Sequence, residues 1–537
     1  MKTKSKLAIV SCVVCLTALT SCNIFPGPEL FEPSYTEHNG SNNIQEADHE
    51  TFGVNIQKKD PNKKNILEKT DRDKIDRAYS QGTDIREQYN LNYLPSLPST
   101  GNSRLLVVPV LLDGTPIPGS YTETDIRKAL TKAFFGTSDE TGWESVASFY
   151  EKSSYGSLNI TGEVTNIFNT SVSLKDLQRS EDDASTVYTD RILCEVYDHF
   201  FGNHIYEVDD FDSNKDGVVD GVYMVYLSNH DRNGKSALWA YTYWLDPSYH
   251  RNSFGAYCWS SYDFMFHNTS DSRFFINKPD AHTYIHESGH LMSLDDYYNA
   301  YDGSTAPIGA VDMMDHNIGD HNAFTKYSLG WTVPEIVDNN STFESKTYTL
   351  RPFESSGDSI VIAPNFNGTS MDEYLILEYY TPTGLNKFDS DQRYDGVYEF
   401  RKPGVKILHA DQRLGVIRAG SNGSYWDGHF VDRVIPETAF SYPKILATNS
   451  CNKDMNERGR SISGENLVTF MDSQAKDGFN KFEHFNLPAT HENLFKEGST
   501  FEKAYPSFVF NDGSQLKYNI RIDSLTPSEC KVTISRK

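Results

Sequence analysis

The 537-residue sequence predicts an α+β fold followed by a β-rich C-terminal region. From about Arg104 to Pro334, apolar runs typical of buried strands alternate with segments whose apolar residues recur at helical spacing. Beyond Pro334, short strand-like runs separated by turn residues predominate. The 32 tyrosines and 31 phenylalanines also favour strands, because aromatic side chains suit a pleated sheet. We therefore expect a twisted mixed sheet with helices, continued by further β structure.

The first residues have the pattern of a secretory signal. A lysine-containing start precedes Leu7–Leu19, an apolar run that is too short to span a membrane comfortably. The run ends in LTSC, which resembles a bacterial lipobox in which Cys22 is lipidated and becomes the first mature residue. An ordinary signal peptide with an incidental cysteine is the alternative. We expect a signal peptide at 1–21 and an extracytoplasmic lipoprotein, on the cell surface or facing the periplasm, attached to the membrane through this lipid alone.

The elements of the folded part follow one another from residue 104. Residues 22–103 are polar and rich in Pro and Gly, which indicates a flexible tether, with a propeptide-like segment as the alternative. The core at 104–335 opens with a buried strand at Leu105–Leu112. A helix capped by Thr122 or Thr124 comes next. After it we expect a helix, turn and strand in SVASFYEKSSYGSLNITGEV, a helix in STVYTDRILCEVYDHFFG and a strand in GVVDGVYMVYLSN.

The later segments are predicted to be strands. A β-rich continuation of the core is expected at 336–485 and a smaller strand unit at 486–537. The strand-like runs are SKTYTLRPF, SIVIAPN, EYLILEYY, GVKILHAD, KYNIRIDSL and CKVTISR.

Charge and cysteine content exclude two kinds of site. The net charge of 50 − 74 = −24 argues against nucleic-acid binding, which needs a positive face. The four cysteines beyond the expected signal are widely spaced and contain no CxxC pair, so a cysteine zinc site is not supported.

We expect the protein to be a monomer.

A metal-binding motif lies in the stretch DAHTYIHESGHLMSLDDYYN. His286 and His290 are four residues apart, so both imidazoles share one face of a helix and can reach one ion. Glu287 stands beside the first ligand, where it can take a proton from a zinc-bound water. The alternative is a chance HExxH on a solvated helix. Asp280 is expected to cap this helix.

The third ligand is sought among the acids that follow. No Glu occurs between Glu287 and Glu335, which disfavours the class of enzymes with a ligand Glu on a later helix. In another class of HExxH zinc enzymes, the helix ends just after the second His and the chain turns back to deliver a ligand six residues later. That position is Asp296 here, and its neighbour Asp295 is the alternative. More distant candidates are Asp302, Asp312, Asp315, His316, Asp320 and His321.

Several segments resemble the immune inhibitor A family of secreted bacterial metallopeptidases. HESGHLMSLDDYY is similar to the family motif HExGHxxGLPDxY, although Ser293 stands at the family's Gly and Asp295 at its Pro. Ordered matches over roughly Leu105 to Asp411 are SFYEKSSYGSLNITGEV, VDMMDHN with FTKYSLGW, EYLILEYY and GVKILHAD. A stretch similar to WSHRW in the family reads WAYTYW here, at Trp239–Trp244.

The resemblance implies a metzincin-like zinc peptidase core with an active-site helix. It implies a supporting role for Met314, or else Met313, in a tight turn beneath the metal, where the alternative is a methionine that fills the core. It also implies a hydrogen bond from Tyr298 near the site, with an ordinary packed tyrosine as the alternative.

A second metal-binding pattern occurs in DSNKDGVVD. Asp212, Asn214 and Asp216 alternate, and Asp220 follows Gly217, as in the first nine positions of an EF-hand loop. The twelfth position is Tyr223 instead of Glu. We expect a structural Ca²⁺ site, with a solvated turn as the alternative.

Together these patterns predict an exported, lipid-anchored zinc endopeptidase with one catalytic Zn²⁺. Its ligands would be His286, His290 and Asp296, its general base Glu287, and its substrates proteins or peptides. One alternative is a non-catalytic, zinc-binding surface lipoprotein on a peptidase fold. The other is a zinc amidase that acts on cell-wall peptides.

Overall fold

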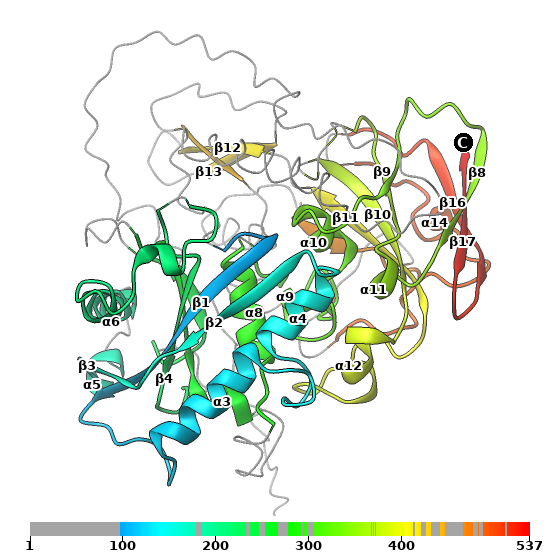
Figure 1. Cartoon of the computed structure of the whole chain (residues 1–537). Coiled ribbons are helices and arrows are strands. Elements are labelled where there is room, and N and C mark those ends of the chain that lie inside the picture. Colours follow the sequence, from blue (N-terminus) through cyan, green and yellow to red (C-terminus); the bar gives the residue numbers. More distant parts are fainter. Residues whose placement is uncertain are drawn as a thin grey trace, which may run out of the picture.

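The structure is a computed structural model. It describes residues 97–178, 185–215, 217–231, 237–245, 253–266, 278–292, 294–298, 306–366, 368, 370, 372–411, 414–419, 426–430, 441–445, 466–475, 482, 487–510 and 513–537. Within these residues the chain is a mixed α/β protein with several sheets and few long helices (Figure 1). The expected signal, Cys22 and most of the expected tether lie outside the described residues.

The first sheet has six strands and carries the candidate site. Strand β1 pairs in parallel with β2, β3 and β4, β4 pairs in parallel with β6, and β5 runs antiparallel to β6 at the outer edge. The bounds are β1 (Gly101–Asp113), β2 (Leu158–Val164), β3 (Phe168–Ser173), β4 (Gly221–Tyr226), β5 (Tyr241–Trp244) and β6 (Ala256–Ser261).

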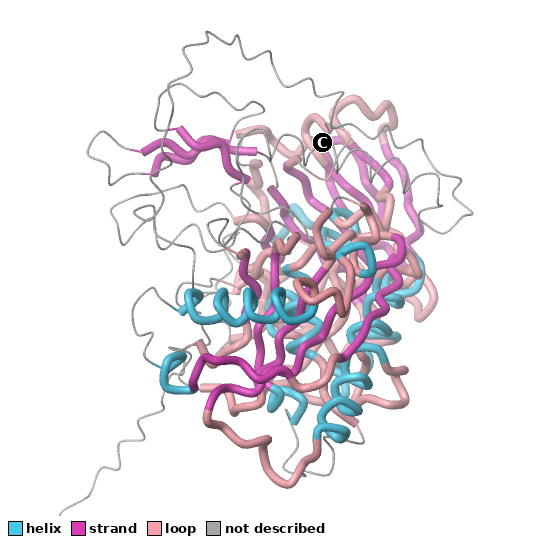
Figure 2. Tube along the Cα trace, turned by 60° about the vertical axis from the view of Figure 1, so that its left-hand side comes forward, coloured by secondary structure: helices cyan, strands magenta, loops and turns pink. Residues whose placement is uncertain are grey.

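Both faces of this sheet are covered, which explains the continuous apolar run expected at Leu105–Leu112. Leu105 and Val107 pack into the same core cluster as helices α3 (Glu123–Phe135), α4 (Val146–Ser153) and α8 (His282–His290). Leu106 and Val108 pack on the other face, in the cluster that contains α6 (Ser185–Phe200). Figure 1 shows α6 on one side of the sheet with α3 and α4 on the other, and Figure 2 shows helices flanking the strands.

Local signals set the helix starts. Thr122 caps α3, because its side chain accepts a hydrogen bond from the N–H of Asp125 while the Asp125 carboxylate accepts from the N–H of Thr122. The N-cap position of α8 is Ala281, one residue later than expected. Asp280 still accepts a hydrogen bond from the N–H of His282 at 3.0 Å. The remaining helices are α5 (Leu174–Gln178), α9 (Met313–His316), α10 (Ala323–Ser328), α11 (Phe353–Ser356), α12 (Lys387–Asp391) and α14 (Phe501–Ala504), with 3₁₀ turns η1 (Val208–Asp210), η3 (Tyr262–Phe266) and η4 (Gly384–Asn386).

Helix α8 is buried on every side. The hydroxyl of Tyr150 on α4 donates a hydrogen bond to the carbonyl of Ile285 at 2.8 Å. Gly289 allows α9 to approach, because a Cβ there would lie 2.6 Å from the sulfur of Met314. Close packing of α9 on α8 therefore explains why the residue before His290 in HESGH is a glycine.

The later strands form three further sheets. The second has the order β15-β11-β10-β9-β7 and the third the order β16-β17-β8, while the fourth contains β12, β13 and β14. The bounds are β7 (Glu335–Val337), β8 (Ser345–Leu350), β9 (Ser359–Ile362), β10 (Glu373–Tyr380), β11 (Gly404–Asp411), β12 (Leu414–Ala419), β13 (Trp426–Phe430), β14 (Ser441–Ile445), β15 (Val468–Phe470), β16 (Tyr518–Leu525) and β17 (Cys530–Arg536).

Two expected boundaries differ from the packing. Strand β8 pairs with β17, so the third sheet joins residues from both sides of the boundary expected at 486. Residues just before 104 also pack on the core, because the N–H of Leu97 donates to the carbonyl of Leu291 and the indole of Trp331 donates to the carbonyl of Ser99.

A buried ion pair within the second sheet also binds the start of helix α10. The ammonium of Lys406 on β11 lies 3.2 Å from Glu378 Oε1 on β10, and both side chains are almost fully buried. The other oxygen, Oε2, accepts the N–H of Ala323 at the start of α10. Three elements from distant parts of the chain therefore meet at one carboxylate.

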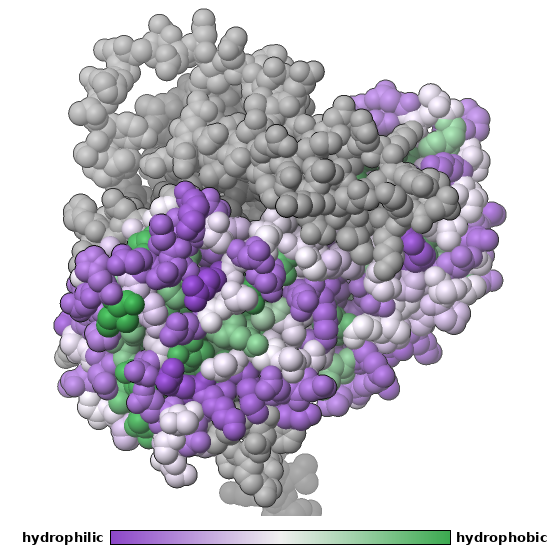
Figure 3. Space-filling view, viewed as in Figure 1, coloured by the Kyte–Doolittle hydropathy of each residue, from purple (hydrophilic) through white to green (hydrophobic). Residues whose placement is uncertain are grey.

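The surface in view in Figure 3 is mainly hydrophilic where the structure describes it, with small apolar areas between charged side chains. None of the described helices has the length and apolar character needed to cross a membrane.

At the start of α8, His282 forms a buried charge cluster. Its Nδ1 lies 2.6 Å from Asp280, its Nε2 lies 3.4 Å from Asp389 on α12, and its ring stacks on Trp143 and Tyr394. Burial opposes the charged imidazole, but the two carboxylates outweigh burial and raise the pKa of His282 to about 10.

We predict that His282→Gln destabilises the protein most at acidic pH. A pKa of about 10 in the folded protein, against 6.5 ordinarily, stabilises the fold fully below pH 6.5. That stabilisation is lost as the pH rises toward 10. Urea unfolding from pH 6 to pH 10 should therefore give a gap between the wild-type and variant free energies of unfolding that narrows with pH. A gap of constant size would contradict the charged state of His282.

Candidate metal centre

The orientation of the two histidines is fixed by main-chain carbonyls. His286 Nδ1 lies 2.8 Å from the carbonyl oxygen of Met313, and His290 Nδ1 lies 2.7 Å from that of Leu294. A carbonyl oxygen only accepts, so Nδ1 carries the proton in both rings. In each neutral ring the lone pair is therefore on Nε2, on the side that faces the other histidine.

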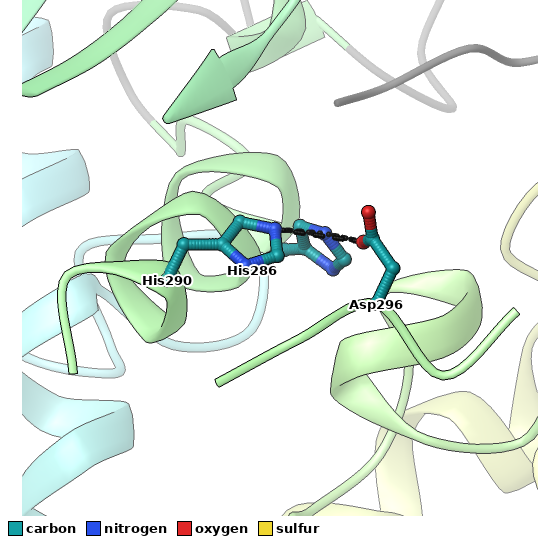
Figure 4. Close-up of side chains that lie close together, drawn as sticks. All are labelled: His286, His290 and Asp296. Carbon is teal, nitrogen blue, oxygen red and sulfur yellow. Dashed lines mark hydrogen bonds and ion pairs between the residues drawn. The ribbon is translucent and has the colours of Figure 1, made fainter. Parts of the chain in front are cut away.

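Asp296 completes the group after the chain turns back from α8. The N–H of Tyr297 donates to the carbonyl of Met314 at 2.7 Å, and its hydroxyl lies 2.7 Å from that of Thr325. These contacts hold Asp296 Oδ1 at 3.0 Å from His286 Nε2 and 3.5 Å from His290 Nε2 (Figure 4). Within the described residues, this is the group of three acidic, His or Cys side chains whose donor atoms converge.

In the neutral tautomers set by the two carbonyls, the converging atoms carry lone pairs rather than protons. The two Nε2 atoms are 3.2 Å apart, and each faces the Asp296 carboxylate, so three lone-pair donors meet in a buried site. Burial alone would raise the pKa of the Asp296 carboxyl, but when the two imidazoles are charged, His290 and His286 lower that pKa to about 2, so a positive charge at this point stabilises the carboxylate. Two imidazole nitrogens and a carboxylate oxygen are ligands that suit Zn²⁺. The residues present therefore fit a zinc ion.

Glu287 lies beside this group with its side chain buried. The hydroxyl of Thr242 on β5 lies 2.9 Å from the main-chain oxygen of Glu287 and 3.2 Å from its Oε2. Burial raises the pKa of the Glu287 carboxyl, against the lowering effect of His290 and His286. A carboxylate whose pKa is raised can accept a proton as a general base and then return it as a general acid.

The supporting residues lie close to the site in different ways. Met314 packs under Gly289, and Met313 contributes its carbonyl to His286. Tyr298 is buried in a small cluster with Ala306 and Ala310. Ser293, which stands at the family's glycine, lies outside the described residues.

Most of the more distant ligand candidates have other contacts. Asp312 caps α9 through the N–H of Met314, and Asp315 accepts the N–H of Ala310. His316 lies 3.1 Å from the carbonyl of Tyr394, and Asp320 pairs with Lys326. His321 is buried among aromatic rings, while Asp302 lies outside the described residues.

The expected calcium loop is described in part. Asp212 Oδ2 accepts the N–H of Gly217, and the two oxygens of Asp220 accept the N–H groups of Ser213 and Arg104. Asn214 lies in the same turn, and Asp216 lies outside the described residues. The calcium site stays a prediction.

Sequence reasoning missed three contributors to the site: the carbonyls of Met313 and Leu294, and the hydroxyl of Thr242. Main-chain carbonyls leave no signature in residue types. Thr242 lies within Trp239–Trp244, which was singled out only for its departure from a family pattern. Thr242 lies close to Glu287 because β5 pairs with β6, and a single sequence does not reveal which strands pair.

Comparison with known proteins gives little further guidance. No family model matches the chain, and no curated protein is significantly similar to it. Among solved structures, the chain is similar to a catalytically inactive OgpA from Akkermansia muciniphila in complex with an O-glycopeptide (glycodrosocin) substrate. The identity is 13%, the alignment covers 67% of this chain and 89% of that chain, and the TM-score is 0.22. A likeness this weak carries no argument about activity, and the resemblance to immune inhibitor A stays a prediction.

We predict that Asp296→Ala lowers zinc affinity on the order of a hundredfold or more, because loss of a residue that merely orients a ligand already costs about ten- to hundredfold. Asp295→Ala is the matched control and should bind zinc as the wild type does. Competition with a chromophoric chelator measures both affinities. The opposite ranking of the two variants would assign the third ligand to Asp295.

Proposed function

We propose that this protein is a zinc-dependent endopeptidase with a metzincin-like core. The observation that carries the proposal is the convergence of His286 Nε2, His290 Nε2 and Asp296 Oδ1 in a buried site, with Nδ1 of each ring directed at a main-chain carbonyl. Three such atoms repel one another unless a cation lies between them. These three residues would hold the zinc.

Bound zinc would polarise a peptide carbonyl and make a water more acidic. Glu287 would accept a proton from the attacking water and return it to the departing amine. The buried setting of Glu287 suits this exchange, because burial raises the pKa of its carboxyl. The carbonyls of Met313 and Leu294 would keep both imidazoles in the tautomer that binds metal.

The proposal includes export and attachment to a membrane through lipidated Cys22, with protein or peptide substrates and a monomeric state. It also includes a structural calcium ion at Asp212, Asn214, Asp216 and Asp220. Two rivals share the zinc site: a non-catalytic surface lipoprotein and an amidase of cell-wall peptides. The retained Glu287 favours an enzyme over the first, and parallel casein and cell-wall digests distinguish the second.

We predict that Glu287→Gln binds zinc as the wild type does but loses peptide hydrolysis by about a hundredfold or more, because a positioned general base contributes roughly 10²–10⁴-fold. The measurement is a peptide-library digest by zinc-loaded protein, with a chelator control. Equal rates for wild type and variant would contradict the proposal. Zinc binding without any cleavage by the wild type would favour the non-catalytic rival.

For calcium, we predict a rise of a few degrees in Tm when the ion is added, because a ligand that binds only the folded state stabilises it by mass action. Asp216→Ala should abolish this rise, while Asp209→Ala, outside the loop pattern, should keep it. Calorimetric scans with and without calcium measure both variants. An unchanged Tm in the wild type would retire the calcium site.

A further inference from the structure

Strand β5 brings one hydroxyl to the candidate general base. In the described residues β5 pairs only with β6, and Thr242 stands opposite Cys258 in that pairing. Side chains alternate along a strand. The hydroxyl of Tyr241 donates to Thr189 of α6 on one face of the sheet, whereas Thr242 faces α8 on the other.

The hydroxyl of Thr242 contacts Glu287 twice. Its Oγ1 lies 2.9 Å from the main-chain oxygen and 3.2 Å from Oε2 of the carboxylate. Cys258 lies against the same atoms, with its sulfur 3.2 Å from Thr242 Oγ1 and 3.4 Å from the Glu287 carbonyl. The thiol can therefore donate to that carbonyl and leave the hydroxyl proton for the carboxylate.

Few other groups restrain this carboxylate. The Glu287 side chain is buried, and among the described residues Thr242 alone supplies a hydrogen-bond donor to it. A glutamate has three rotatable side-chain bonds, and a base misplaced by about 1 Å can cost roughly a hundredfold in rate. The β-branched threonine is restricted at χ1, so the direction of its hydroxyl is set by the strand.

We infer that Thr242 is a positioning residue, whose hydroxyl on the outer strand of the first sheet orients the Glu287 carboxylate toward the metal site. The inference rests on the proposed function, since it assigns to Glu287 the role of base. It gives the outer strand a part in the chemistry that no sequence motif indicates. The methyl group of Thr242 has no such part, so the hydroxyl alone should matter.

The test compares Thr242→Val, which keeps the shape but loses the hydroxyl, with Thr242→Ser, which keeps the hydroxyl. Thr189→Val is the matched control, because it removes a buried hydroxyl of α6 that contacts Tyr241 of β5 on the opposite face of the sheet. For zinc-loaded proteins we expect Thr242→Val to lower kcat by about ten- to hundredfold, as for a lost hydrogen bond to a charged group, with KM and zinc content unchanged. Thr242→Ser should keep most of the wild-type kcat, and Thr189→Val should keep all of it.

A second readout does not depend on turnover. Acetohydroxamic acid binds zinc and places a hydroxyl beside a neighbouring base, so calorimetry should show about tenfold weaker binding to Thr242→Val than to wild type or Thr242→Ser. The inference would be overturned if Thr242→Val and the wild type had equal hydroxamate affinities and equal kcat. This holds even if Glu287→Gln is inactive, because that result concerns the base and not its orientation. An active Glu287→Gln would instead overturn the proposed function. If the wild type cleaves no peptide, the hydroxamate affinities alone decide the role of Thr242.

Discussion

The candidate site depends on the tautomer of two histidines. Because the carbonyls of Met313 and Leu294 each take an Nδ1 proton, both Nε2 lone pairs are directed at one point with Asp296. That arrangement requires α9 to lie against α8, which Gly289 permits by having no side chain beside Met314. It also requires the chain to turn sharply after His290. Packing, turn and ligand geometry are therefore one constraint, and none of the three can change alone.

Features that depend on neighbours in the sequence were predictable. The four-residue spacing of His286 and His290 places them on one helical face whatever the fold around them. The apolar run at Leu105–Leu112 indicated a buried strand, and Thr122, one of the two expected candidates, caps α3. The alternation of helices and strands indicated the mixed architecture, although neither the metzincin-like fold nor the identity of a bound metal follows from it.

Features that depend on distant pairing were not predictable from one sequence. Thr242 reaches Glu287 only because β5 pairs with β6 in a particular register, and a shift of one residue would turn its hydroxyl to the other face. The contact of His282 with Asp389 spans more than a hundred residues, and so does the pairing of β8 with β17. Alternating polarity predicts that a segment is a strand, but the strand it pairs with is determined by the packing of the whole molecule.

The place of β17 in the third sheet affects the order in which the protein can fold. Residues 530–536 form the middle strand, with β16 on one side and β8 on the other. Until they are available, β8 has no partner in this sheet, and its closure spans some 180 residues of chain, an entropic cost that favours late formation. A ribosome-bound chain would therefore carry β8 as an unpaired edge, the kind of segment that chaperones bind and that aggregates when left uncovered.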